Sequence, residues 1–217
     1  MSGAAKRAAA PLVVAGRVPR LYLDANILLP EYLRSIFLDL ADEGLVRVHW
    51  GEQVLAEVRR HLVSPKFGKS PESTDKLLAD MARAFPDALV SGSEKLEPMF
   101  QGKTDPKDAH VAAGALKLSQ SVQGDDDVVL VTSNMKHLPA SAFESTPVRP
   151  ARPNIVLKEL LAANTEVANV LTRMLARFKA PPVAKDDLLN VLDASNCSEP
   201  PRLSWRPVGV SQTGVVC

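Results

Sequence analysis

Short apolar runs alternate with amphipathic segments along the chain from Leu21 onwards. The runs that predict strands cover 21–23, 45–50, 88–90 and 128–131. Between them, apolar residues recur at helical spacing over 31–43, 52–62 and 74–85, and again from 106 onwards. Strands that alternate with helices in this way are typical of a parallel sheet between helices. We therefore predict an α/β fold, a three-layer α/β/α sandwich with a mainly parallel central sheet.

The character of the sequence changes near both ends. Residues 1–20 combine small and basic residues with a short apolar stretch that Pro11 interrupts, and we expect a disordered tail there rather than an export signal. We expect the sandwich to span 21–150, with a mobile loop over 64–73. After Pro153, apolar residues at helical spacing predict a helical extension over 151–195, whose third helix would cover 185–192. Residues 196–217 are expected to form a loose C-terminal tail.

Composition limits the classes of function. The chain has 217 residues, with 26 Lys and Arg against 25 Asp and Glu, so nucleic-acid binding has to come from local basic patches. No run approaches the roughly 20 apolar residues of a membrane span. Cys197 and Cys217 have no metal-ligand spacing and form no disulfide framework, which suits a reducing, cytoplasmic location.

Several polar side chains are expected near the ends of strands and helices. Asp24 follows the first apolar strand, and Asn134 follows the strand 128–131. Because ligands gather at the carboxyl ends of parallel strands, both should point to one site. Asp108 is expected in the first turn of a helix that Asp105 caps, and it shares that helix's apolar face. Glu57 lies beside the apolar stripe of its own helix. We predict that these acidic groups converge.

Converging carboxylates repel one another and need a compensating charge. Oxygen ligands without cysteine or paired histidine favour a hard cation, Mg²⁺ or Mn²⁺. Such an ion can polarise a phosphodiester and ionise an attacking water, which is the chemistry of nucleic-acid hydrolysis. Each residue alone also has a structural explanation: helix capping for Asp105 and Asp108, an exposed charge for Glu57, and a simple turn for 24–26.

Four segments in this order resemble the PIN-domain family of nucleases, especially bacterial toxin ribonucleases of the VapC-like kind. The segments are LDANIL at 23–28, LAEV at 55–58, DPKDAHVAA at 105–113 and VTSN at 131–134, and the third is the most specific. The resemblance covers about 21–150 and implies an α/β/α sandwich with Mg²⁺ or Mn²⁺ as cofactor. It further implies cleavage of RNA and pairing with an antitoxin protein.

The resemblance also assigns roles to individual residues. Asp24, Glu57 and Asp108 match the family's three acidic metal-site positions, and Asn134 matches its fourth catalytic position. The supporting residues that it implies are Asn26, Asp105 and Thr132. The chain departs from the pattern at His137 and Leu138, where relatives carry an acidic residue and Phe. We leave the role of His137 open between substrate contact and plain surface.

Basic residues near these segments are candidates for contact with RNA phosphates, although each is equally well explained as a solvated charge. They are Arg59, Arg60, Lys66, Lys69 and Lys107, with Lys103 close by. Trp50 is expected in the core rather than against a base. His110 lies about 200° around the helix from Asp108, so we do not place it beside that residue. His61 is treated as a charge at a helix end.

Two other functions stay open. A PIN-like domain that has lost catalysis could bind RNA or a protein, and His137 motivates that alternative. An aspartate-nucleophile phosphatase would use Asp24, but Asn26 stands where such enzymes usually carry a second Asp. The sequence does not fix the oligomeric state, and a homodimer is left open.

Overall fold

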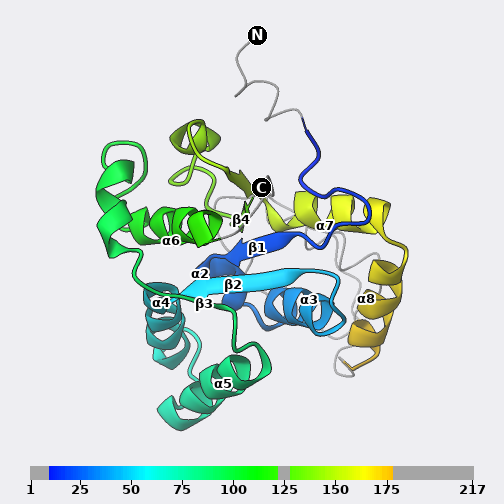
Figure 1. The fold of residues 1–217 in the computed structure, drawn as a ribbon. Helices are drawn as coiled ribbons and strands as arrows, with labels where there is room; N and C mark the ends of the chain where they lie inside the picture. Colours follow the sequence, from blue (N-terminus) through cyan, green and yellow to red (C-terminus); the bar gives the residue numbers. More distant parts are fainter. Residues whose placement is uncertain (1–9, 122–127, 178–217) are drawn as a thin grey trace, which may run out of the picture.

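The computed structural model describes residues 10–121 and 128–177 of the chain. Its centre is a sheet of five parallel strands in the order β3-β2-β1-β4-β5, with helices on both faces (Figure 1). This confirms the predicted α/β/α sandwich with a parallel sheet. In the part of the chain that the structure describes, no helix has the length and apolar character needed to cross a membrane.

The strands are short, and most of the connections are helical. The strands are β1 (Arg20–Leu23), β2 (Arg47–Gly51), β3 (Leu89–Val90), β4 (Val128–Val131) and β5 (Val148–Ala151). The α-helices are α2 (Ala25–Leu28), α3 (Glu31–Asp42), α4 (Glu52–Val63), α5 (Pro71–Ala84), α6 (Ala109–Ser121), α7 (Pro153–Ala163) and α8 (Glu166–Arg177). Two 3₁₀ helices, η1 (Glu94–Phe100) and η2 (Ala140–Phe143), complete the described elements.

Strand β1 is the middle strand, and the chain changes direction beside it. The chain passes from β1 to β2 and β3 on one side, and then crosses to β4 and β5 on the other. Because crossovers between parallel strands are right-handed, the helices before and after this reversal cover opposite faces. Helix α6 contacts all five strands, while α3 packs against α8. The reversal places the carboxyl ends of β1 and β4 side by side, where open α/β sheets bind ligands.

The two central strands, β1 and β4, are buried on both faces. All four residues of β4 are inaccessible to solvent, as are Leu21, Tyr22 and Leu23 in β1. Trp50 in β2 is buried and packs edge-on against Phe85, with 6.2 Å between ring centroids. Its predicted place in the core is confirmed.

Two helices begin at different residues from those expected. Helix α5 starts at Pro71, three residues before the expected Thr74, and it shortens the loop expected over 64–73. The Ser70 hydroxyl accepts a hydrogen bond of 3.1 Å from the Ser73 amide, and Pro71 occupies the first helical position. Helix α6 begins at Ala109, so Asp108, which we expected in its first turn, lies just before the helix.

The helices expected after Pro153 are present as α7 and α8, and they share the core of the sheet domain. Buried side chains of both helices, including Leu157 and Val170, belong to the same apolar cluster as the strands. The expected boundary at residue 150 lies within β5. The Arg173 guanidinium also binds the Glu43 carboxylate, just beyond α3, at 2.6 Å. The expected helix at 185–192 and the tail at 196–217 lie outside the described residues.

Residues 10–20, expected to belong to a disordered tail, instead lie against the domain and enter β1. The Glu159 carboxylate on α7 accepts hydrogen bonds from the amides of Leu12 (2.5 Å) and Val13 (3.0 Å), and Val13 is buried. The Arg149 guanidinium donates to the Pro11 carbonyl at 2.8 Å. Residues 1–9 lie outside the described part of the chain.

A close approach between Tyr22 and α6 fixes the distance of that helix from the sheet. The Tyr22 ring is buried beneath the glycine at position 114, where a Cβ atom would lie 1.9 Å from the Tyr22 hydroxyl oxygen and 2.5 Å from Cζ. Only glycine allows the helix to pack at this depth. The start of α6, which carries the candidate site residues, depends on this packing.

Gly114→Ala should therefore destabilise the protein, although Ala is normally better in a helix interior by about 1 kcal/mol. Overpacking against the Tyr22 ring should lower the free energy of unfolding by at least about 1 kcal/mol. Chemical denaturation measures this, with Gln120→Ala at an exposed position of the same helix as the control. A Gly114→Ala protein as stable as the wild type would show that α6 does not pack in this way.

Candidate active site

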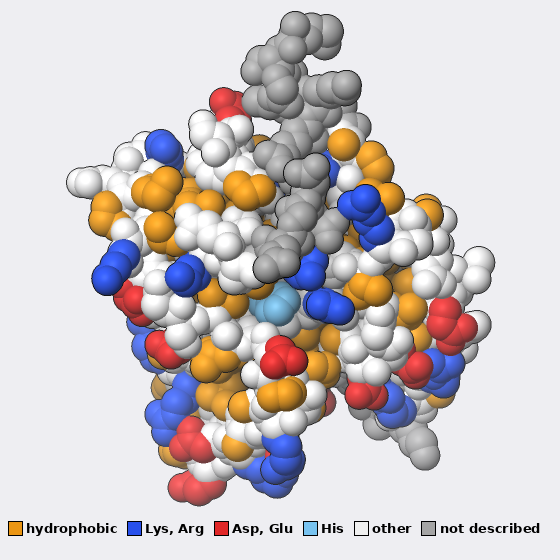
Figure 2. Space-filling view, in the orientation of Figure 1, with side chains coloured by type: hydrophobic (Ala, Val, Ile, Leu, Met, Phe, Trp, Pro, Cys, Tyr) orange, Lys and Arg blue, Asp and Glu red, His pale blue; other side chains and the backbone are white. Residues whose placement is uncertain are grey.

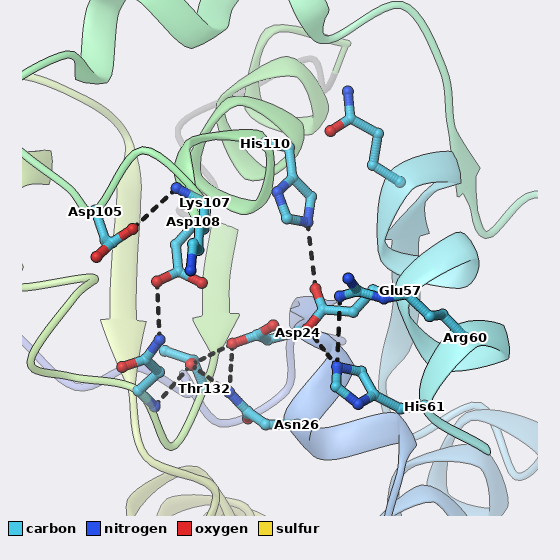
Figure 3. Close-up of polar contacts among 12 residues, drawn as sticks. Asp24, Asn26, Glu57, Arg60, His61, Asp105, Lys107, Asp108, His110 and Thr132 are labelled. Carbon is cyan, nitrogen blue, oxygen red and sulfur yellow. Dashed lines mark hydrogen bonds and ion pairs between the residues drawn. The ribbon is translucent and has the colours of Figure 1, made fainter. Parts of the chain in front are cut away.

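The candidate site begins with a buried carboxylate at the end of the central strand (Figure 3). Asp24 follows β1 directly, and only 4% of its surface is exposed. Its Oδ2 atom accepts hydrogen bonds from the Thr132 hydroxyl (2.6 Å) and from the Asn26 amide nitrogen (2.5 Å). Thr132 follows β4, so the ends of two neighbouring strands hold this carboxylate between them.

Asn26 ties the single-turn helix α2 to the segment after β4. Its side-chain oxygen accepts a hydrogen bond of 3.1 Å from the Ser133 amide, and its Nδ2 lies 3.2 Å from the Thr132 hydroxyl oxygen. We expected a simple polar turn over 24–26. The chain instead forms a helical turn here, in which Ile27 and Leu28 are buried in the core. Asn26 therefore orients Asp24 and the loop after β4 together.

Asp108 stands immediately before helix α6. Its carbonyl accepts the first helical hydrogen bonds, from Val111 (3.0 Å) and Ala112 (3.3 Å), so it precedes the helix and our placement in the first turn is corrected. Asp105 does not cap α6. Its Oδ1 accepts a 3.0 Å hydrogen bond from the Lys107 amide, and this closes a separate turn before the helix.

Asn134 connects the two aspartates. Its Nδ2 donates to Asp108 Oδ2 at 3.0 Å, and its backbone amide donates to the Thr132 hydroxyl oxygen at 2.9 Å. Because Thr132 donates in turn to Asp24, one continuous set of hydrogen bonds runs from Asp24 to Asp108. The structure therefore brings together Asp24, Asp108 and the pair Thr132 and Asn134, which come from three segments far apart in the sequence.

Glu57 approaches from helix α4, with 30% of its side chain exposed. Its carboxylate lies between two imidazoles: His61 Nε2 is 3.5 Å from Oε1, and His110 Nε2 is 3.7 Å from Oε2. His110 does lie on the opposite side of the helix start from Asp108, as the spacing predicts (Figure 3). Sequence reasoning missed that this side faces Glu57, because the contact depends on how α4 packs against α6.

The three carboxylates act on one another electrostatically. Burial is the main cause that raises the pKa of Asp24 from 3.8 to about 6; the negative charges of Glu57 and Asp108 contribute to this rise, and the hydrogen bond from Thr132 opposes it. Among the described residues, none of these carboxylates forms an ion pair with Lys or Arg. The site therefore carries negative charge that nearby basic side chains do not neutralise.

The donor set suits a hard divalent cation, although the ligands are not gathered into a compact group. The side chains around Asp24 offer carboxylate, amide and hydroxyl oxygens, the ligands that Mg²⁺ and Mn²⁺ prefer. Across residues 10–121 and 128–177, no three His, Cys, Asp or Glu side chains form a group that could hold a metal ion as they stand. A cation would have to draw the carboxylates closer.

His137 lies next to the acidic residues. Its Nδ1 is 3.4 Å from Asp108 Oδ2 and 3.9 Å from Asp105 Oδ2, and its carbonyl accepts a hydrogen bond of 3.2 Å from the Asp105 amide. The backbone contact holds the turn of Asp105 beside the loop after β4. In its protonated form this imidazole would supply positive charge at Asp108.

The basic residues considered for RNA contact fall into two groups. Figure 3 draws Lys107 beside Asp108 and Arg60 beside His61, and the Arg60 guanidinium is 3.5 Å from His61 Nε2. Arg59 instead binds Asp75 on α5, with Nε 2.6 Å from Oδ1, and the Lys66 ammonium lies 5.8 Å from the centre of the Phe67 ring. Lys69 is exposed on the same loop. On the face drawn in Figure 2, basic and acidic side chains are interspersed.

No family model, curated protein or solved structure matches this chain. The resemblance to PIN-domain nucleases therefore rests on the four sequence segments.

Asp24→Asn should stabilise the metal-free protein more at pH 8 than at pH 4.5. The pKa of Asp24 is raised from 3.8 to about 6, so the folded state holds this proton more tightly and stability falls as the pH rises from 4 through 6. Ionised Asp24 should then lower the free energy of unfolding by about 2–3 kcal/mol at pH 8, and the amide removes that penalty.

Urea unfolding in EDTA at the two pH values measures this difference. Asp42→Asn, at an exposed aspartate that ends α3, is the control. A gain of equal size at both pH values would mean that the charge of Asp24 is not the cause.

Proposed function

We propose that this chain is a metal-dependent endoribonuclease that hydrolyses RNA phosphodiester bonds, and that it acts as the toxin of a toxin–antitoxin pair. The observation that supports this best is the buried Asp24 carboxylate, whose pKa is raised by burial and by two further carboxylates, neither of which pairs with a Lys or Arg of the described residues. A site of this kind favours a divalent cation and a reaction that such a cation promotes. The resemblance of four segments to PIN-domain nucleases supplies RNA as the substrate.

In this proposal, Asp24, Glu57 and Asp108 hold Mg²⁺ or Mn²⁺. When bound, the cation would polarise the scissile phosphate and lower the pKa of the attacking water. Thr132 and Asn134 orient two of the ligands, because their hydrogen bonds fix Asp24 Oδ2 and Asp108 Oδ2. Asn26 helps to orient Asp24, because its side-chain amide donates a hydrogen bond to Asp24 Oδ2.

The chain also offers groups for the proton and for the RNA backbone. Glu57 is the most exposed of the three carboxylates, so it is the one best placed to accept a proton from a water molecule that approaches from solvent. Arg60 and Lys107, which are drawn beside the site residues in Figure 3, would contact phosphates that flank the cleaved bond. Such contacts position a strand without reading its sequence. An antitoxin protein is the expected partner, and a homodimer stays open.

A second candidate is a PIN-like module that binds RNA or a protein without cutting RNA. Two observations favour it: the acidic side chains do not form a ready metal-binding group among the described residues, and His137 stands beside Asp108. This module would bind RNA equally well with EDTA and with Mg²⁺. Binding without cleavage, across several RNAs and with either metal, would select it over the nuclease.

The purified protein should cleave RNA internally in the presence of Mg²⁺ or Mn²⁺ and not in EDTA. Asp24→Asn and Asp108→Asn should each slow cleavage by at least about 100-fold, since each removes a carboxylate that holds the cation, and the cation stabilises the negative charge of the transition state. The products of end-labelled RNA on denaturing gels measure this. Asp42→Asn, at the exposed last residue of α3, should cleave like the wild type. Full activity in both site variants would refute the assignment.

A further inference from the structure

His110 has a buried nitrogen that lacks a hydrogen-bond partner. The residue is the second of helix α6, and 12% of its side chain is exposed. Its Nε2 is buried and has no partner within hydrogen-bonding distance. Glu57 Oε2, at 3.7 Å, is the acceptor that this nitrogen faces. A buried donor is costly to leave unpaired, and a shift of less than 1 Å would complete this hydrogen bond.

The other imidazole near Glu57 is less suited to the same task. His61 is 41% exposed and comes from the helix that carries Glu57, so it adds no link to another element. Its Nε2 also lies 3.5 Å from the Arg60 guanidinium, which can only donate. When Arg60 donates to this nitrogen, His61 has no proton there to give to Glu57. His110 is therefore the better donor to the carboxylate.

Two side chains at the start of α6 point in different directions within the site. Asp108 contacts the Asn134 amide on one side, and His110 faces Glu57 on the other (Figure 3). The two residues are held by the same helical turn, because the Asp108 carbonyl accepts the hydrogen bonds that begin it. One helical turn therefore holds Asp108 against Asn134 and His110 opposite Glu57.

We infer that His110 is a positioning residue: its imidazole N–H holds the Glu57 carboxylate towards Asp24 and Asp108, and joins α4 to α6 at the site. A neutral imidazole is sufficient for this role. One part of this inference rests on the proposed function, namely that the positioned Glu57 binds the cation. The contact with Glu57 itself can be tested without metal.

The test compares His110→Leu, which removes the donor, with His110→Gln, which keeps an N–H donor. Mn²⁺ affinity is measured by calorimetry on the full chain without RNA, and His61→Leu is the matched control. We expect His110→Leu to weaken Mn²⁺ binding about 10- to 100-fold, as the loss of a group that orients a ligand does. His110→Gln and His61→Leu should stay near the wild type. Unchanged affinity in His110→Leu, or an equal loss in His61→Leu, would overturn the inference.

A second measurement, in EDTA, separates this inference from the nuclease proposal. The unfolding midpoints of His110→Leu, Glu57→Ala and the double variant form a mutant cycle. We expect the effect of His110→Leu to shrink when Glu57 is absent, and additive effects would overturn the inference. Coupling in the cycle without any Mn²⁺ binding by the wild type would refute the metal site while the contact stands. Mn²⁺ binding by the wild type together with additive effects in the cycle would refute the contact between His110 and Glu57, while the metal site would stand.

Discussion

The burial of one carboxylate at the end of the central strand governs the chemistry of this site. Asp24 has lost most of its contact with water, and two neighbouring carboxylates oppose its ionisation. Its hydrogen bonds from Thr132 and Asn26 recover only part of the lost solvation. The protein therefore keeps a group whose charged form destabilises the fold. Proteins accept such a penalty mainly at functional sites, where a ligand of opposite charge removes it.

The sheet order brings these groups together. Because the chain reverses beside β1, the ends of β1 and β4 are neighbours, and Asp24 meets Thr132 and Asn134 although more than 100 residues separate them. The start of α6 then brings His110, and Asp108 just before the helix, to the same edge, at a depth that the contact between Tyr22 and the helix fixes. The site is thus a product of topology and close packing rather than of any single segment.

Local pattern predicted much of this. The fully apolar run of β4 and the helical spacing of α3 and α4 indicated the sandwich, and polar residues after the strands indicated the edge that bears the site. What the sequence did not reveal depends on contacts between distant elements: β5, the attachment of residues 10–20 to α7, and the meeting of His110 with Glu57. The start of α6 was misplaced because Asp105, a good capping residue, closes a preceding turn instead.

The central claim is that a divalent cation compensates these buried carboxylates. Crystals of the full chain grown with Mn²⁺ would test it most directly, through the anomalous scattering of the metal. The account predicts one strong peak at the ends of β1 and β4, with bonds of about 2.0–2.4 Å to oxygens of Asp24 and Asp108. Well-ordered carboxylates without a peak there, in crystals saturated with Mn²⁺, would contradict it.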